Sequence, residues 1–156
     1  MTTSAPAPGV VRSLIPARID RVTLGTRRAL FVGDAATASD PLTGEGIAQA
    51  LESGILAAEA IEAAGGTAPD RAVAGYRAAV GAGLVPDHRM SMLLIRALAH
   101  RKGARAAVAI AGVSDWTRRN FARWLFEDYP RSIITTPSRW HRHMFTGPGA
   151  YKPNVG

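Results

Sequence analysis

The strongest constraint on the fold is a helical spacing of apolar residues between positions 43 and 129, which Gly and Pro interrupt at intervals. Apolar residues that recur every three or four positions form one face of a helix, and Gly or Pro commonly ends it. Only residues 10–32 have strand character. We therefore expect a fold that is mostly α with a short N-terminal β segment. The expected helices cover about residues 43–64, 69–81, 86–102, 104–111 and 114–129.

The first of these helices has the clearest pattern. Thr43 is a good N-cap, and Glu45 in the first turn suits the positive end of the helix dipole. Its apolar residues are predicted to form a buried stripe, on which Gly54 would allow close approach of a neighbour. That stripe consists of Ile47, Leu51, Ile55, Ala58 and Ile61. Gly65 and Gly66 predict a left-handed end to the helix.

The segment before this helix contains the expected strand. Ala29–Val32 is a short, wholly apolar run that ends at Gly33, which is typical of a strand buried on both faces. Residues 26–28 are predicted to form the turn that leads into it.

Pro and Ser residues mark the starts of later helices. Pro69 opens the second helix, which Gly81, Gly83 and Pro86 would break or kink, and Ser114 would cap the last helix. The third helix has an apolar face that we expect in the core, rather than as a prenyl-binding tunnel. That face consists of Met90, Leu94 and Leu98. The expected division of the chain is a flexible leader at 1–9, a segment at 10–66, a helical region at 67–130 and an irregular tail at 131–156.

Composition excludes several classes of site. The chain has 156 residues, of which 47% are hydrophobic, enough for one domain with one core. It has no cysteine, which excludes disulfides, thiolate nucleophiles and iron–sulfur ligation and fits a cytoplasmic location. No apolar run approaches the roughly 20 residues of a membrane span. His141 and His143 have no third ligand near them in sequence, so we expect no metal site.

Basic residues exceed acidic residues by 19 to 12, and most of the excess follows residue 86. Such a charge favours nucleic acid, anionic lipid headgroups or a diphosphate, although a biased coding composition also explains it. No nucleic-acid-binding motif accompanies it. The last helix combines Trp116, Phe121, Trp124 and Leu125 with Arg118, Arg119 and Arg123. We favour a core helix with an Arg123–Glu127 pair; the alternative is peripheral contact with an anionic membrane.

Residues 31–47 carry the chemistry that the sequence predicts. The expected strand ends in Gly33–Asp34, a short loop follows, and a helix opens with Gly44, Glu45 and Gly46. This order brings one carboxylate close to backbone N–H groups at the start of a helix, where negative charge is favoured. A glycine there lets a flat ligand approach the backbone.

The sequence of residues 31–47 resembles the second flavin motif of FAD-dependent oxidoreductases. Within it, residues 41–47 are similar in sequence to the corresponding segment of the geranylgeranyl reductase family. The resemblance covers residues 14–62 and implies a truncated α/β FAD-binding fold, in which residues 10–66 would be the C-terminal part of the FAD-binding domain. It implies that Asp34 binds the ribitol of FAD and that the helix start lies against the isoalloxazine ring. The residues that it implies in cofactor binding are Gly33, Asp34, Pro41, Leu42, Gly44, Glu45, Gly46 and Ile47.

The family also has an N-terminal G-x-G-x-x-G motif for the pyrophosphate, and this sequence lacks it. The two other G-x-G segments, Gly81–Gly83 and Gly147–Gly149, do not match this motif, either in the residues that follow them or in their position relative to a strand and a helix. We therefore expect the isolated chain to bind FAD poorly, whether it is a fragment, a split subunit that needs a second chain, or a remnant.

The resemblance implies reduction of an isoprenoid carbon–carbon double bond, with a nicotinamide or ferredoxin as electron donor. The alternative is an FAD-dependent monooxygenase or halogenase of the same superfamily. The sequence identifies no catalytic residue, and Glu45 and Tyr76 are candidate proton donors by residue type alone.

Overall fold

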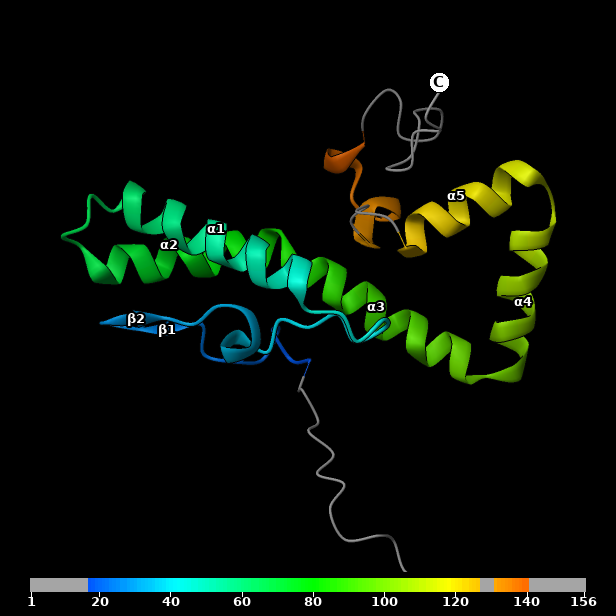
Figure 1. Ribbon diagram of the computed structural model, residues 1–156, viewed down its shortest axis with the longest axis horizontal. Helices are drawn as coiled ribbons and strands as arrows, with labels where there is room; N and C mark the ends of the chain where they lie inside the picture. The colour runs from blue at the N-terminus through cyan, green and yellow to red at the C-terminus, as the bar shows by residue number, and fades with distance from the viewer. Residues whose placement is uncertain (1–16, 127–130, 141–156) are drawn as a thin grey trace, which may run out of the picture.

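The computed structural model describes residues 17–126 and 131–140, and this part is mostly helical (Figure 1). A two-stranded antiparallel sheet lies near its N-terminal end, which confirms the expected fold class at this level. Among the described residues, no helix is both long and apolar enough to cross a membrane. The expected leader, Glu127, His141, His143 and the glycines at 147–149 lie outside the described residues.

The sheet is a small hairpin. Strand β1 (Gly25–Thr26) pairs with β2 (Ala29–Leu30), with Gly25 opposite Leu30. The turn at residues 26–28 is close to the prediction, but the predicted strand buried on both faces is wrong. Ala29 and Val32 are exposed, because a hairpin with two strands has no neighbouring strands to cover it.

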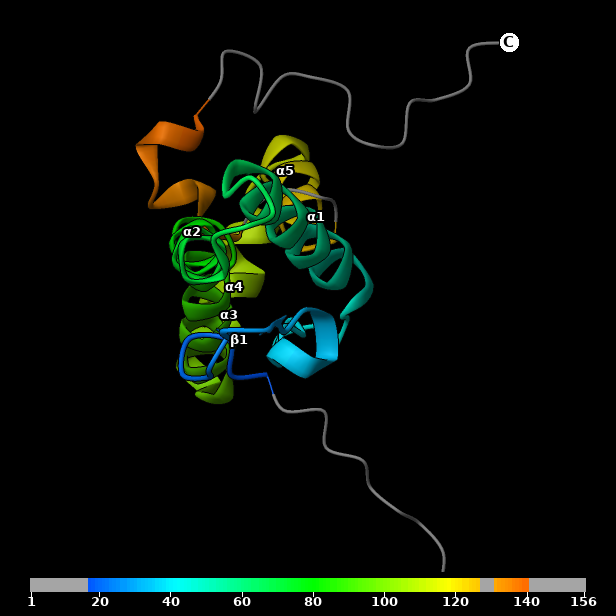
Figure 2. The same ribbon diagram turned by 90° about the vertical axis from the view of Figure 1, so that its left-hand side faces the viewer.

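Helices α1 (Ile47–Ala63) and α2 (Pro69–Ala82) form an antiparallel hairpin (Figures 1 and 2). Gly65 and Gly66, with φ of +68° and +70°, make the turn between them. Both have the left-handed conformation that side chains disfavour. The predicted end of α1 and the predicted start of α2 at Pro69 are therefore confirmed.

Helix α1 buries a different face from the one that the sequence predicts. Its buried residues are Ser53, Ala57 and Ala60. Small side chains let α2 approach closely, since a Cβ atom added at Gly75 would lie 3.7 Å from the Ala60 Cβ. Gly54 has open space beside it, so its predicted role in close approach is wrong. The predicted buried stripe is exposed to 73% at Ile47, 66% at Leu51, 59% at Ile55 and 49% at Ile61, and Ala58 is exposed too.

The core joins α2 to the loop that follows the sheet. Tyr76, Val80 and Ala36 are fully buried, and Leu24 is buried beside them. The Tyr76 hydroxyl donates a hydrogen bond to the Phe31 carbonyl oxygen at 2.8 Å. Burial raises the pKa of Tyr76 above its ordinary value. The segment that leads to Gly33 is therefore fixed to α2 by packing and by a hydrogen bond.

Helix α3 (Leu84–Ala99) starts after Gly83, two residues before the prediction, and Pro86 is accommodated in its first turn. Its buried residues are Leu84, His88 and Ser91. The face that was predicted to lie in the core is only half-buried at Met90 and Leu94 and exposed at Leu98.

Helix α4 (Arg101–Gly112) lies at the end of α3 far from the α1–α2 turn, and α5 (Asp115–Phe126) folds back from α4 toward the middle of the molecule (Figure 1). Gly103 lies inside α4, not before it. A Cβ atom at this position would clash with the Ala97 carbonyl group, so the close approach of α3 to α4 requires a glycine. Ser114 caps α5 as predicted: its Oγ accepts a hydrogen bond from the Thr117 N–H at 3.1 Å. The predicted end of α5 near residue 129 lies outside the described residues.

Two short 3-10 helices, η2 (Arg131–Ile134) and η3 (Pro137–Arg139), lie in the expected irregular tail. The first packs on α3, where the Ser132 N–H donates a hydrogen bond to the Asp87 carboxylate at 2.8 Å.

Candidate functional site

The loop that carries Asp34 is fixed against α1. It forms the 3-10 helix η1 (Gly33–Ala36), and the Gly33 N–H donates a buried hydrogen bond to Ser53 Oγ at 2.9 Å. Gly33 has a φ of +53°, and a Cβ atom added to it would lie 3.1 Å from the Ala50 Cβ. A glycine is therefore required both for the backbone conformation and for the close approach to α1. This contact fixes the position of Asp34 relative to the helix.

Asp34 faces the amino end of α1. A Cβ atom added at Gly46, the N-cap residue, would lie 3.6 Å from Asp34 Oδ1 and 3.2 Å from Ser39 Oγ. Asp34 is exposed, and no described residue forms a hydrogen bond or an ion pair with its carboxylate. The structure thus brings together the two groups that the sequence places 12 positions apart.

The start of α1 differs from the prediction. Thr43 is not the N-cap; the helix begins at Ile47, and no side chain caps it. The Gly44 N–H donates to the Asp40 carbonyl oxygen at 2.9 Å, and the Glu45 N–H donates to Thr43 Oγ1 at 3.3 Å. These two amides are therefore engaged within the loop. The amides without intrahelical partners are those of residues 47–49, in the first turn of α1.

Asp40 explains this difference, and the sequence analysis missed its role. It is buried, and its Oδ2 accepts a hydrogen bond from the Thr43 hydroxyl at 2.8 Å. Its Oδ1 accepts one from the Leu42 N–H at 3.3 Å. An Asp before Pro is a common turn signal, since its side chain can bond the backbone two residues on. Asp40 thus shapes the loop that presents Pro41 and Leu42, both half-buried.

These groups define the chemistry that the site can perform. The Asp34 carboxylate can accept hydrogen bonds from hydroxyl groups of a ligand. The uncapped first turn of α1 provides amide donors and the positive end of a helix dipole, which favour a partly negative ligand atom. Glu45 is exposed in the same loop.

Tyr76 does not belong to this site. Its side chain is fully buried, and its hydroxyl donates to the Phe31 carbonyl oxygen. Its position in the core therefore removes it as a candidate proton donor, whereas Glu45 is exposed beside the site.

A buried polar pair, separate from this site, lies near the amino end of α3. His88 is buried, and its Nε2 lies 3.3 Å from Asp20 Oδ1. Burial lowers the pKa of His88 below its ordinary value of 6.5, against the opposing effects of the Asp20 and Asp40 charges. Burial dominates because the ring has little access to water. Among residues 17–126 and 131–140, no group of three or more His, Asp or Glu side chains is placed to hold a metal ion.

Comparisons of the chain with protein-family models, with curated proteins and with solved structures find no match.

Proposed function

We propose that this chain forms the flavin-contacting part of an FAD-dependent oxidoreductase. The observation that supports this proposal is the position of Asp34: its carboxylate lies beside Gly46, at the uncapped start of α1. A flavin needs a hydrogen-bond acceptor for its ribityl hydroxyls and donors for the polar edge of its ring. The carboxylate and the first amides of α1 provide both from adjacent positions.

The residues at this site fit a flavin in distinct roles. Asp34 would accept hydrogen bonds from the ribityl chain, and the amides of residues 47–49 would face the pyrimidine edge of the ring. Pro41 and Leu42, half-buried in the loop, would lie along the ring. When bound, FAD supplies hydride chemistry. The role of α1 would be electrostatic, since its amino end stabilises negative charge on a reduced flavin ring.

The resemblance of residues 41–47 to geranylgeranyl reductases favours an isoprenoid carbon–carbon double bond as substrate and a nicotinamide or ferredoxin as electron donor. A nucleotide-binding segment outside this chain would hold the adenosine diphosphate half of FAD. An FAD-dependent monooxygenase or halogenase is the second candidate. Analysis of the product separates the two, because a reductase yields a saturated prenyl chain and the others yield a hydroxylated or halogenated product.

Riboflavin is the suitable probe for the isolated chain, because it carries the ring and the ribityl chain without the diphosphate. We expect the 156-residue chain to quench riboflavin fluorescence weakly. Asp34→Ala should weaken the binding by roughly tenfold, since a charged hydrogen bond to hydroxyl groups is lost.

The matched control is Asp70→Ala, which removes another exposed carboxylate, on α2. We expect it to leave the affinity unchanged. Equal affinity of the Asp34→Ala chain and the wild-type chain would show that the ribityl assignment is wrong.

A further inference from the structure

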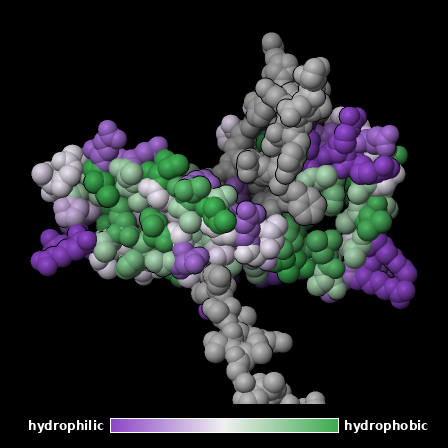
Figure 3. Space-filling view, viewed as in Figure 1, coloured by the Kyte–Doolittle hydropathy of each residue, from purple (hydrophilic) through white to green (hydrophobic). Residues whose placement is uncertain are grey.

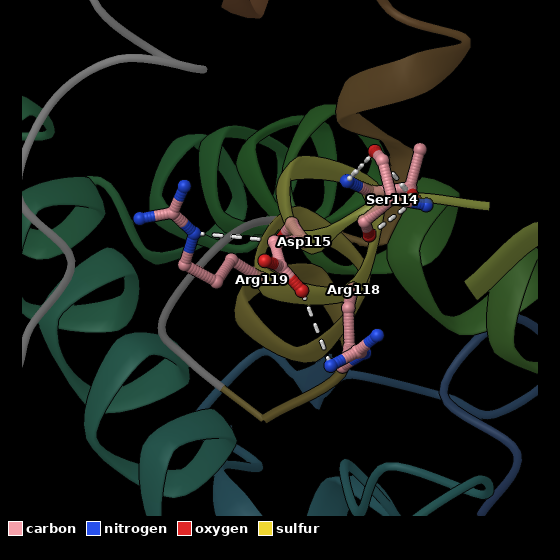
Figure 4. Close-up of polar contacts among 5 residues, drawn as sticks. Ser114, Asp115, Arg118 and Arg119 are labelled. Carbon is pink, nitrogen blue, oxygen red and sulfur yellow. Dashed lines mark hydrogen bonds and ion pairs between the residues drawn. The ribbon is translucent and has the colours of Figure 1, made fainter. Parts of the chain in front are cut away.

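The segment from Arg89 to Trp124 is strongly cationic. It contains one acidic residue, Asp115, and eight basic residues, which are Arg89, Arg96, Arg101, Lys102, Arg105, Arg118, Arg119 and Arg123. Asp115 already pairs with Arg118 at 3.3 Å (Figure 4). We refer to helices α4 and α5 together with Val113 and Ser114 as the cationic hairpin. It attracts anionic surfaces through charge alone.

The cationic hairpin also exposes large apolar side chains. Helix α4 has no buried residue. Val108 is 74% exposed, Ile110 60%, Val113 75% and Trp116 50%. These residues lie on α4 and around its junction with α5, and Figure 3 shows hydrophobic surface there next to strongly hydrophilic surface. A helix of this length is only marginally stable in water, and exposed apolar side chains add little to its stability there. A cluster of such side chains is typical of a surface that contacts an apolar phase.

The apolar residues continue into a hollow. A groove of about 540 Å³ lies between α3, α4, α5 and η2. Leu94, Leu98, Ile110, Phe121 and Trp124 are among the residues that line it. Aromatic and aliphatic side chains therefore face one concave space, and Arg123 of α5 is among the residues that line it.

The junction between the two helices is well ordered by hydrogen bonds. The Ser114 N–H donates to Thr117 Oγ1 at 2.8 Å, and the Thr117 N–H donates back to Ser114 Oγ at 3.1 Å. Figure 4 shows Arg118 and Arg119 extending to different sides of α5, while Arg119 Nε contacts the Asp115 carbonyl oxygen at 3.3 Å. The cap thus holds the apolar junction and its flanking cations in a fixed arrangement.

We propose that the cationic hairpin docks on anionic membrane surface. The Val108, Val113 and Trp116 side chains enter the boundary between headgroups and acyl chains, and neighbouring Arg and Lys side chains contact the lipid phosphates. Nucleic acid would also attract the cations, but it offers no apolar phase for exposed aliphatic side chains such as Val108 and Val113. The proposal does not depend on the flavin, because α4 and α5 carry none of the candidate flavin-contacting residues.

Co-sedimentation of the full chain with vesicles tests the proposal. We expect binding to vesicles of phosphatidylcholine mixed with phosphatidylglycerol, little binding to phosphatidylcholine alone, and loss of binding as salt is raised. The double variant Val108→Asp with Val113→Asp, at two exposed residues outside the groove, should lower the affinity by at least about tenfold. The matched control is Leu51→Asp with Ile55→Asp, which changes an exposed apolar face on α1 and should leave the affinity unchanged.

A second pair of variants tests the charge. Arg101→Glu with Lys102→Glu should also lower the affinity by at least about tenfold, whereas Arg27→Glu with Arg28→Glu, on the β hairpin, should lower it much less. All four residues are exposed, and circular dichroism verifies that each variant retains its helices.

Three outcomes would overturn the proposal. The first is equal binding to neutral and to anionic vesicles. The second is full binding by the Val108→Asp, Val113→Asp chain. The third is binding to duplex DNA, competed by salt, without binding to anionic vesicles, which would show that the basic residues serve a nucleic-acid partner.

Discussion

The α1–α2 hairpin and the α4–α5 hairpin are built from helices of similar kind but pack in opposite ways. The first brings small residues such as Ser53 and Ala60 against the core around Tyr76. The second has no buried residue in α4. Both expose aliphatic side chains, yet α1 carries only acidic charges and α4 only basic ones. The comparison teaches that helices of similar apolar spacing can form either a packed hairpin or an exposed one, and that here the two carry opposite charge.

The largest difference between the two hairpins should be in their contribution to stability. Tyr76→Ala removes a fully buried ring and should lower the free energy of unfolding by about 3–5 kcal/mol. Trp116→Ala, at a position that is 50% exposed, should cost about 1 kcal/mol or less. Urea unfolding followed by circular dichroism measures both. Equal losses would mean that the second hairpin is packed as tightly as the first.

Substitutions at two glycines test which face of α1 is packed. Gly33→Ala forces a side chain into a left-handed conformation near Ala50 and should lower the free energy of unfolding by roughly 2 kcal/mol. Gly54→Ala lies in α1 with open space around it and should raise that free energy by about 0.5–1 kcal/mol. Thermal unfolding of the two variants should therefore shift in opposite directions. A shift in the same direction would contradict the orientation of α1.

The cap at Ser114 should matter for the exposed hairpin alone. Ser114→Ala removes the acceptor of the Thr117 N–H and should lower local stability by about 1 kcal/mol. Amide hydrogen exchange should become faster in α5 and stay unchanged in α1 and α2. Faster exchange throughout the chain would mean that the two hairpins unfold as one unit.

The smallest expected effect comes from His88, where α3 meets the N-terminal segment. Its pKa is lower folded than unfolded, so the unfolded chain binds the proton more readily. The contribution of the neutral ring is therefore complete above pH 6.5, the ordinary value, and stability falls as the pH drops from there towards the folded pKa. His88→Gln should flatten this decline in chemical unfolding experiments. The control is His100→Gln, at an exposed residue, which should preserve it.

The parts that the sequence predicted correctly depend on neighbours in the chain. Gly65 and Gly66 end α1, Pro69 opens α2 and Ser114 caps α5, each through backbone geometry of a few adjacent residues. Such features need no knowledge of the tertiary packing. The adjacency of Asp34 and the α1 start was also predicted, but tertiary contacts of Gly33 with Ser53 and Ala50 fix its geometry.

The parts that it missed depend on contacts across the fold. Aliphatic residues at helical spacing gave the wrong buried face of α1, because α2 packs on the small residues Ser53, Ala57 and Ala60. Thr43 is a good capping residue by type, but its hydroxyl bonds Asp40 and the helix begins four residues later. Intrinsic preference is a weak guide where a tertiary partner selects the face.

The most direct test is whether a flavin binds at the start of α1 or in the groove beside α5. Amide chemical shifts of the full chain, titrated with riboflavin, would locate the contact. The account predicts shifts at Asp34, Gly46 and residues 47–49 that need roughly tenfold more riboflavin with Asp34→Ala. Shifts confined to the aromatic groove around Trp116 and Phe121, unaffected by that substitution, would contradict it.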